Sequence, residues 1–170
     1  MKKGSSEGEQ IAGDELRKQL LVLLKGGEAH ADFDAAVANM PAELRGTVPE
    51  RLPYSAWQLV EHLRIAQRDI LNFSSPPTGG YHPLQWPEDY WPKVAEPPTA
   101  SAWDQSIAAI RSDREAFEGL ITRPEADLMK PFRWGNGQNL LREALLIADH
   151  MAYHLGELVV LRRLLGVWPK

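Results

Sequence analysis

The feature that most constrains the fold is an apolar stretch near the C-terminus, from about Asn139 to Leu165. Residues 144–148 read Ala-Leu-Leu-Ile-Ala, so a helix through them is apolar in every direction. A helix of this kind is typical of the buried centre of a helical domain. No strand-like alternation of useful length and no internal repeat occurs elsewhere in the chain. The sequence therefore predicts an all-α fold in which other helices cover this one.

Apolar residues at helical spacing also mark the region from Ile11 to Met40. Gly26 and Gly27 interrupt it, and paired glycines weaken or bend a helix. Two interpretations stay open: one long helix with a weak middle, or two helices that meet at the glycines. We expect residues 1–10 to be a flexible N-terminus and residues 11–170 to form a single domain.

Two more helices carry recognisable start signals. Ser55 followed by Gln58 is a capping box, and it predicts a helix from there to about residue 73. Ser101 followed by Asp104 is a similar pattern, which predicts a helix to about residue 121. Together with the region before Pro41 and the apolar C-terminal helix, these elements predict a four-helix bundle.

The connection over residues 74–98 is long and contains seven of the thirteen prolines. Prolines exclude a continuous helix. The segment also carries large aromatic residues, which a flexible linker would not: Tyr81, Trp86, Tyr90 and Trp91. Fully extended, it spans roughly 80 Å at about 3.3 Å per residue. The helices on either side can therefore run parallel, joined by a crossover.

Composition excludes several classes of function. The formal net charge is −4, and no basic run occurs, so we expect no nucleic-acid partner. The chain has no cysteine, which excludes disulfides, thiolate metal sites and a cysteine nucleophile. No run of about eighteen apolar residues is unbroken, so we expect no membrane span. A cytoplasmic location is the expectation.

Histidines supply the sharpest chemical signal. His150 and His154 are four residues apart in the predicted last helix, so their imidazoles project side by side, within about 40° of each other. This spacing lets one helix offer two nitrogens to a metal ion. Glu157 follows on the same face as a further oxygen ligand or a base. His62 lies on the apolar stripe of the second helix, which would face this pair inside a bundle.

Three interpretations of the histidines stay open. Three nitrogen ligands with an open position are typical of a catalytic metal site. The ion could instead be structural or adventitious in a non-enzymatic binding or stress protein. A third possibility involves no metal, only buried histidines that bond to Glu157 and Asp149. Spacing does not identify an ion, because three imidazoles suit zinc, nickel, copper or iron.

Other residues are candidates for the surroundings of this site. Asp149 is a candidate carboxylate for orienting a ligand. His30, after the glycine break, is a candidate donor toward a substrate. The loop aromatic residues either line a pocket or anchor their loops onto the bundle: Trp86, Tyr90, Trp91 and Trp134.

Three segments of the chain together resemble the DinB-like superfamily of metalloenzymes: Leu52–His62, Trp86–Pro92 and Leu140–Glu157. The most specific elements are a tryptophan five residues before a histidine in the second helix, and the His-x-x-x-His pair in the last. The resemblance covers about residues 12–166. It implies a four-helix bundle of up-down-down-up course with a long connection between the second and third helices.

The resemblance also implies nickel or zinc bound by three histidines, which correspond to His62, His150 and His154. Members often form homodimers. Characterised relatives include S-transferases that use bacillithiol or mycothiol, and a mycothiol-dependent maleylpyruvate isomerase. The implied function is therefore a metal-dependent thiol S-transferase or hydrolase with a small-molecule substrate. Glu157 and Asp149 would orient ligands. No motif in this chain specifies a particular thiol.

Overall fold

The structure is a computed structural model, which describes the backbone of residues 3–169 and the side chains of residues 10–169. Over that range the chain forms five α-helices and one 3-10 helix, with no strand, so the all-α prediction is confirmed. The elements are α1 (Lys3–Lys25), α2 (Phe33–Val37), η1 (Ala42–Leu44), α3 (Ala56–Ser74), α4 (Ala102–Thr122) and α5 (Leu140–Leu164).

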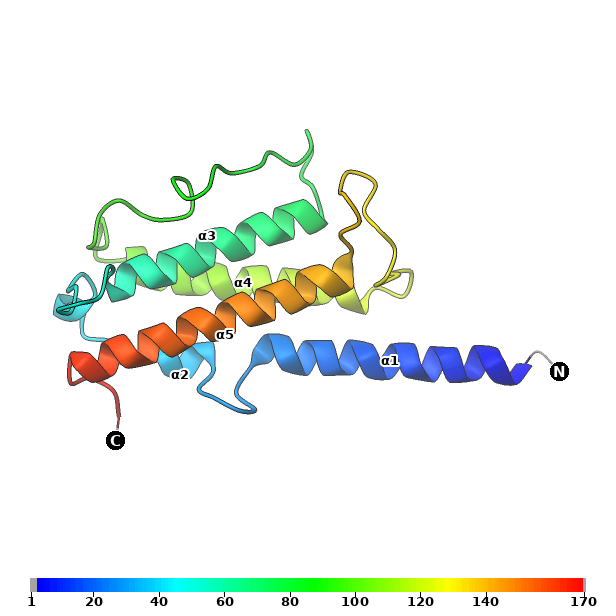
Figure 1. The fold of residues 1–170 in the computed structure, drawn as a ribbon, viewed down its shortest axis with the longest axis horizontal. Helices are drawn as coiled ribbons and strands as arrows, with labels where there is room; N and C mark the ends of the chain where they lie inside the picture. The colour runs from blue at the N-terminus through cyan, green and yellow to red at the C-terminus, as the bar shows by residue number, and fades with distance from the viewer. Residues whose placement is uncertain (1–2, 170) are drawn as a thin grey trace.

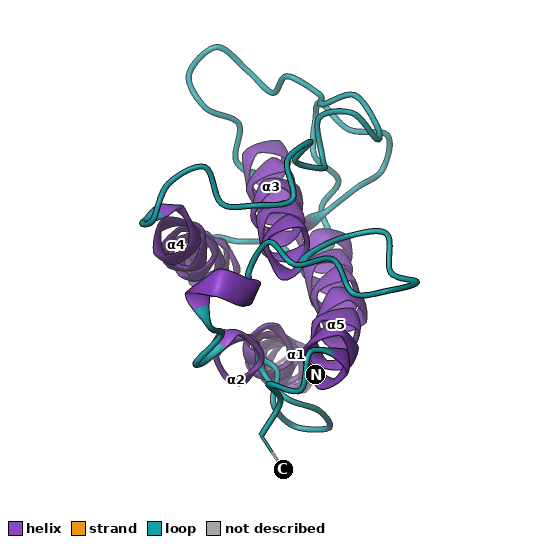
Figure 2. Ribbon diagram, turned by 90° about the vertical axis from the view of Figure 1, so that its left-hand side faces the viewer, coloured by secondary structure: helices purple, strands orange, loops and turns teal. Residues whose placement is uncertain are grey.

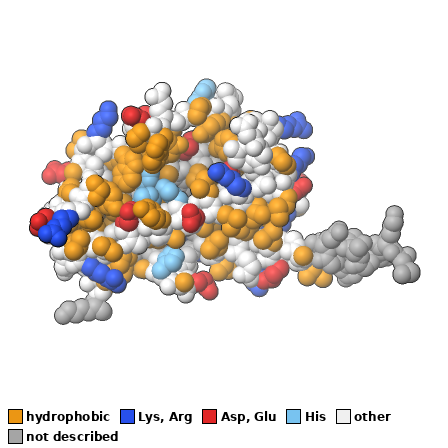
Figure 3. Space-filling model, viewed as in Figure 1, with side chains coloured by type: hydrophobic (Ala, Val, Ile, Leu, Met, Phe, Trp, Pro, Cys, Tyr) orange, Lys and Arg blue, Asp and Glu red, His pale blue; other side chains and the backbone are white. Residues whose placement is uncertain are grey.

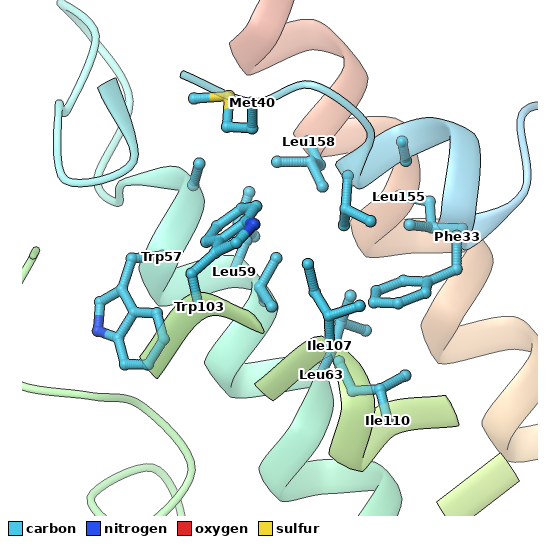
Figure 4. Packing of buried hydrophobic residues seen from close by; sticks show 14 of the residues in the cluster. Phe33, Met40, Trp57, Leu59, Leu63, Trp103, Ile107, Ile110, Leu155 and Leu158 are labelled. Carbon is cyan, nitrogen blue, oxygen red and sulfur yellow. The ribbon is translucent and has the colours of Figure 1, made fainter. Parts of the chain in front are cut away.

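The four long helices lie side by side in two directions. In Figure 1 the colours show α1 and α5 running from right to left, whereas α3 and α4 run from left to right. Helix α3 packs against both α4 and α5, and α1 packs against α4 and α5 on the other side (Figure 2). Buried side chains from α2, α3, α4 and α5 form one core cluster at the C-terminal end of α5 (Figure 4).

The glycine pair ends a helix, so the region before Pro41 forms two helices and not one long helix with a weak middle. Helix α1 stops at Lys25, and Gly26 and Gly27 have φ angles of +71° and +88°, which L side chains rarely adopt. A separate short helix, α2, follows, with Asp32 as its N-cap. At its other end α1 begins at Lys3 rather than at Ile11. The expected flexibility of residues 1–10 stays a prediction, and residues 1 and 2 lie outside the described residues.

The predicted caps formed in one case and not in the other. The Ser55 hydroxyl accepts from the Gln58 backbone N–H at 3.2 Å, and the Gln58 side chain accepts from the Ser55 N–H at 3.1 Å. This confirms the capping box. Helix α4 does start after Ser101, but the Ser101 side chain makes no capping bond, because its backbone is helical rather than extended.

The crossover segment returns along α3, so that α4 starts at the same end of the molecule as α3 (Figure 1). Two of its hydroxyls hold it there: Tyr81 and Tyr90 both donate to the Asp69 carboxylate of α3, at 3.0 and 2.6 Å. Near its end, the Pro92 carbonyl accepts from the Gln58 side chain at 3.0 Å. The segment is therefore an ordered part of the fold that covers one face of α3.

Helix α5 contacts each of the other four helices. By length and composition alone it is the one helix of the described chain that could cross a membrane. It also carries His150, His154 and Glu157, and the core helix of a helical domain passes the same test. Its contacts match the central position that the sequence predicts, but only 33% of its most apolar window is buried and Leu145 is 46% exposed. The expectation that other helices cover it on every side is therefore wrong, because one face of α5 stays open.

Candidate metal centre

Three imidazoles meet where α3 and α5 face each other. The Nε2 atom of His62 lies 3.0 Å from Nε2 of His150 and 3.1 Å from Nε2 of His154. The three residues form the one group of histidine and carboxylate side chains in the described chain whose ligand atoms gather closely enough to hold a metal ion. His62 and His154 are buried, and His150 is partly buried.

The hydrogen bonds on the far side of two rings fix where their protons lie. Nδ1 of His62 donates to the Tyr90 carbonyl at 2.9 Å, and Nδ1 of His154 donates to the Glu157 carboxylate at 2.6 Å. A neutral imidazole carries one N–H, so both Nε2 atoms present lone pairs to each other. A cation between them removes this repulsion, and histidine ligands usually donate their other N–H in this way. The residues present therefore fit a metal ion.

The nitrogen spacing can be compared with that of two ligands bound to one ion. Two nitrogens at about 2.0–2.1 Å from one ion lie about 3.4 Å apart at a tetrahedral angle and about 2.9 Å apart at a right angle. The distances from His62, 3.0 and 3.1 Å, are closer to the right angle. Both separations from His62 are therefore short enough for one ion to contact the paired nitrogens, and all three residues lie close enough together to hold it.

Burial keeps the imidazoles of His62 and His150 neutral, which is the form that binds metals. Burial lowers the pKa of His62, against a smaller opposing effect of the bond to the Tyr90 carbonyl. Burial, followed by the neighbouring His154 and His62, lowers the pKa of His150 to about 4. Both rings are therefore neutral at neutral pH, with lone pairs available as ligands.

Aromatic side chains from the crossover form one wall of this site. The Trp91 ring stacks on His62 with centroids 3.9 Å apart, and Tyr54 also stacks on Trp91, with centroids 5.6 Å apart. The Trp86 ring meets His62 edge-on at 6.4 Å and is 68% exposed. On the α5 side, Tyr153 contacts the His154 ring and is 65% exposed. In Figure 3 histidine atoms reach the surface among such hydrophobic side chains.

Glu157 contacts the three-histidine group directly, through His154. Its carboxylate accepts from His154. It also raises the pKa of the nearby Tyr54 hydroxyl, after the larger effect of burial. The carboxylate therefore fixes the orientation of one imidazole. It also makes the His154 ring a stronger electron donor.

Replacing Glu157 should weaken metal binding while leaving all three histidines in place. We expect Glu157→Ala to lower the affinity for nickel or zinc by about 10- to 100-fold, the usual effect of removing a carboxylate that supports a ligand. Glu157→Gln keeps an acceptor and should lose less. Competition titration against a chromophoric chelator measures this. The exposed Glu115 of α4 provides a matched Glu→Ala control, and equal affinities for the two alanine variants would contradict the prediction.

The structure does not bring the other predicted residues to this group. Trp134 donates from its indole N–H to the Phe73 carbonyl and stacks on Phe132, about 16 Å along α3 from His62. His30 lines a different cavity, next to the glycine break. Asp149 is exposed and lines a separate depression with Leu145 and Ala152. Trp134 therefore anchors its loop onto the bundle, one of the two alternatives that sequence left open.

Tyr54 and Asp69 were missed by sequence reasoning, as was the backbone carbonyl of the loop aromatic Tyr90. Tyr54 lies inside the segment that carries the family resemblance, so that segment was a usable signal. Asp69 reaches the site only through Tyr90, whose hydroxyl it binds. Tyr90 then presents a backbone carbonyl to His62, and no side-chain pattern marks a carbonyl.

The fold and the site define the class of this protein: an all-helical domain with a buried group of three histidines that could hold a metal ion. Residues 27–158, which include α2 to most of α5, match the family model of the DinB superfamily. The chain belongs to the DinB superfamily. Searches of curated proteins and of solved structures gave no match.

Proposed function

We propose that this protein is a metal-dependent enzyme of the thiol S-transferase or hydrolase type, built on an up-down-down-up four-helix bundle. One observation carries the proposal: the Nε2 atoms of His150 and His154 both lie within 3.1 Å of Nε2 of His62, in a group that could hold a metal ion. Nickel(II) or zinc(II) is the proposed ion, held by His62, His150 and His154. When bound there, it would supply a Lewis acid that lowers the pKa of a water or thiol at an open position.

The residues around the histidines have separate tasks in this proposal. His62 is held by the Tyr90 carbonyl and by the stacked Trp91 ring. The Glu157 carboxylate keeps the proton of His154 on Nδ1, so that Nε2 stays free as a ligand. The exposed rings of Trp86 and Tyr153 offer apolar surface to a small electrophilic substrate. A low-molecular-weight thiol is a proposed co-substrate, and a cytoplasmic homodimer is the proposed working form.

An activity screen on one protein preparation tests the proposal. Protein loaded with nickel or zinc should transfer a thiol such as bacillithiol or mycothiol to an aromatic halide, or hydrolyse an activated ester. His150→Ala should lower either rate by at least a hundredfold, because one ligand of the ion is gone. Metal bound at one ion per chain with no turnover of either class, in loaded protein, would favour the rival proposal of a non-enzymatic metal-binding protein.

A further inference from the structure

One face of α3 carries three polar side chains that all contact the crossover segment, which lies along this helix in Figure 1. Gln58, His62 and Asp69 are spaced by four and seven residues, so they lie on the same side of the helix. Gln58 donates to the Pro92 carbonyl at 3.0 Å. His62 donates to the Tyr90 carbonyl at 2.9 Å, and Asp69 accepts from the Tyr90 hydroxyl at 2.6 Å. Tyr90 is therefore bonded to α3 twice, once through its backbone and once through its side chain.

The two bonds of Tyr90 connect Asp69 to the metal centre. A separation of 2.6 Å is typical of a strong bond from a hydroxyl to a carboxylate. Burial, and then the bond to Asp69, raises the pKa of Tyr90, so the hydroxyl keeps the proton that it donates. At the other end of the residue, the carbonyl accepts the Nδ1 proton of His62. The position of a backbone carbonyl depends on what holds its residue, and here the Asp69 carboxylate holds it.

Tyr81 binds the same carboxylate but lies away from the histidines. Its hydroxyl is 3.0 Å from one oxygen of Asp69 and 3.3 Å from the other, both longer than the bond from Tyr90. The Tyr81 ring packs edge-on against Phe73, with centroids 5.1 Å apart. Phe73 lies about 16 Å along α3 from His62. The two tyrosines thus share an anchor, and of the two it is Tyr90 that connects this anchor to His62.

The turn that ends at Tyr90 is closed by its own bonds. The Asp89 N–H donates to the Gln85 carbonyl at 2.9 Å, and the Asp89 carboxylate accepts from the Gln85 N–H at 2.8 Å. Trp86 lies inside this turn, and its ring packs against those of Tyr90 and His62, with centroids 5.5 and 6.4 Å apart. An anchor on Tyr90 therefore also places the exposed Trp86 ring beside the histidines.

We propose that Asp69 is a positioning residue for His62. Through Tyr90, it holds the carbonyl that keeps the His62 proton on Nδ1, so that Nε2 faces His150 and His154. The inference rests on the three-histidine site of the proposed function, and it adds to that site a residue two turns of α3 away. Groups that support a metal-binding histidine in this way change metal affinity by about 10- to 100-fold when they are lost.

Hydrogen exchange of the His62 Nδ1 proton, followed by NMR in the metal-free protein, tests the proposal. Tyr90→Phe keeps the ring and the carbonyl but removes the hydroxyl that Asp69 holds. It should speed exchange by about tenfold, the effect of one lost hydrogen bond on a local opening. Asp69→Ala should have the same effect, and combining the two should add little, because both remove the same bond. Tyr81→Phe is the matched control, and it should leave the exchange rate nearly unchanged.

Titration with zinc(II) provides a second measurement on the same variants. Tyr90→Phe and Asp69→Ala should weaken zinc binding about tenfold, whereas Tyr81→Phe should keep the affinity of the unaltered protein. Both tyrosine variants remove a hydroxyl from the same carboxylate, so a general loss of stability would affect them alike.

Equal exchange rates in Tyr90→Phe and Tyr81→Phe would overturn the proposal, and so would equal zinc affinities. If exchange responds as expected but the unaltered protein binds no zinc, the positioning of His62 by Asp69 is supported and the proposed metal centre fails. The two Tyr→Phe variants each remove one oxygen atom, so their comparison decides the matter even if Asp69→Ala does not fold.

Discussion

Loading the purified protein with nickel or zinc should raise its melting temperature by about 8–16 °C. The metal binds only where the fold has brought three imidazoles together, so binding adds directly to the free energy of unfolding. Free metal at a thousand times the dissociation constant adds about 4 kcal/mol. For a chain of this length, each kcal/mol shifts the melting temperature by about 2–4 °C. Differential scanning calorimetry with and without metal measures the shift.

His150→Ala should abolish this shift and leave the metal-free protein nearly as stable as the unaltered one. His150 is the least buried of the three imidazoles, so the cavity left by its removal is small. Its loss also relieves the crowding of nitrogens around His62 Nε2, 3.0 Å away. Losing one ligand of three should weaken metal binding about a thousandfold, the equivalent of about 4 kcal/mol.

A matched control is available in the crossover segment. His82 is exposed there, so His82→Ala should keep the full metal-dependent shift. If the metal-free His150→Ala protein instead unfolds at a much lower temperature, the three histidines stabilise the fold without an ion, and a structural role is favoured. A melting temperature of the unaltered protein that does not respond to nickel or zinc would contradict the assignment of a metal centre.

Local patterns in the sequence predicted the parts of this molecule that local forces decide. The capping box at Ser55 depends on two residues three apart, and it formed as predicted. The adjacency of His150 and His154 follows from the helix repeat alone. The capping pattern at Ser101 failed, because the preceding turn sets a helical backbone angle there.

Parts that depend on tertiary packing could not be read from the sequence in the same way. His62 lies on an apolar stripe, but which helix that stripe faces is decided by packing, so the family resemblance was needed to join it to the pair. Trp134 was a candidate for the site, yet its connection meets the far end of α3. His30 sits behind a glycine turn with positive φ angles, which sends the chain to the other side of α5.

A second large effect is expected at Arg162, a residue that no sequence pattern marks. Its side chain is 1% exposed, and among the described residues no carboxylate pairs with it. The guanidinium instead donates to the carbonyls of Ala36 at 2.6 Å and Val167 at 3.0 Å. A five-residue helix such as α2 leaves most of its carbonyls without partners inside the helix. Arg162 therefore joins α2 and the C-terminal turn to α5, at the cost of a buried charge whose pKa burial lowers.

Arg162→Ala should lower the free energy of unfolding by about 4 kcal/mol, because it leaves several buried carbonyls without donors and empties a large space. That corresponds to a fall of about 8–16 °C in melting temperature. The guanidinium of Arg162 lies 5.1 Å from the Trp168 ring, and that of the adjacent, exposed Arg163 lies 6.0 Å from it. Arg163→Ala is therefore a close control that should change little. Metal affinity should be the same in both variants, since Arg162 lies two turns of α5 beyond His154.

Equal melting temperatures for the two variants would show that α2 does not depend on this guanidinium. A parallel loss of metal binding in Arg162→Ala alone would instead couple the docking of α2 to the position of the α5 histidines.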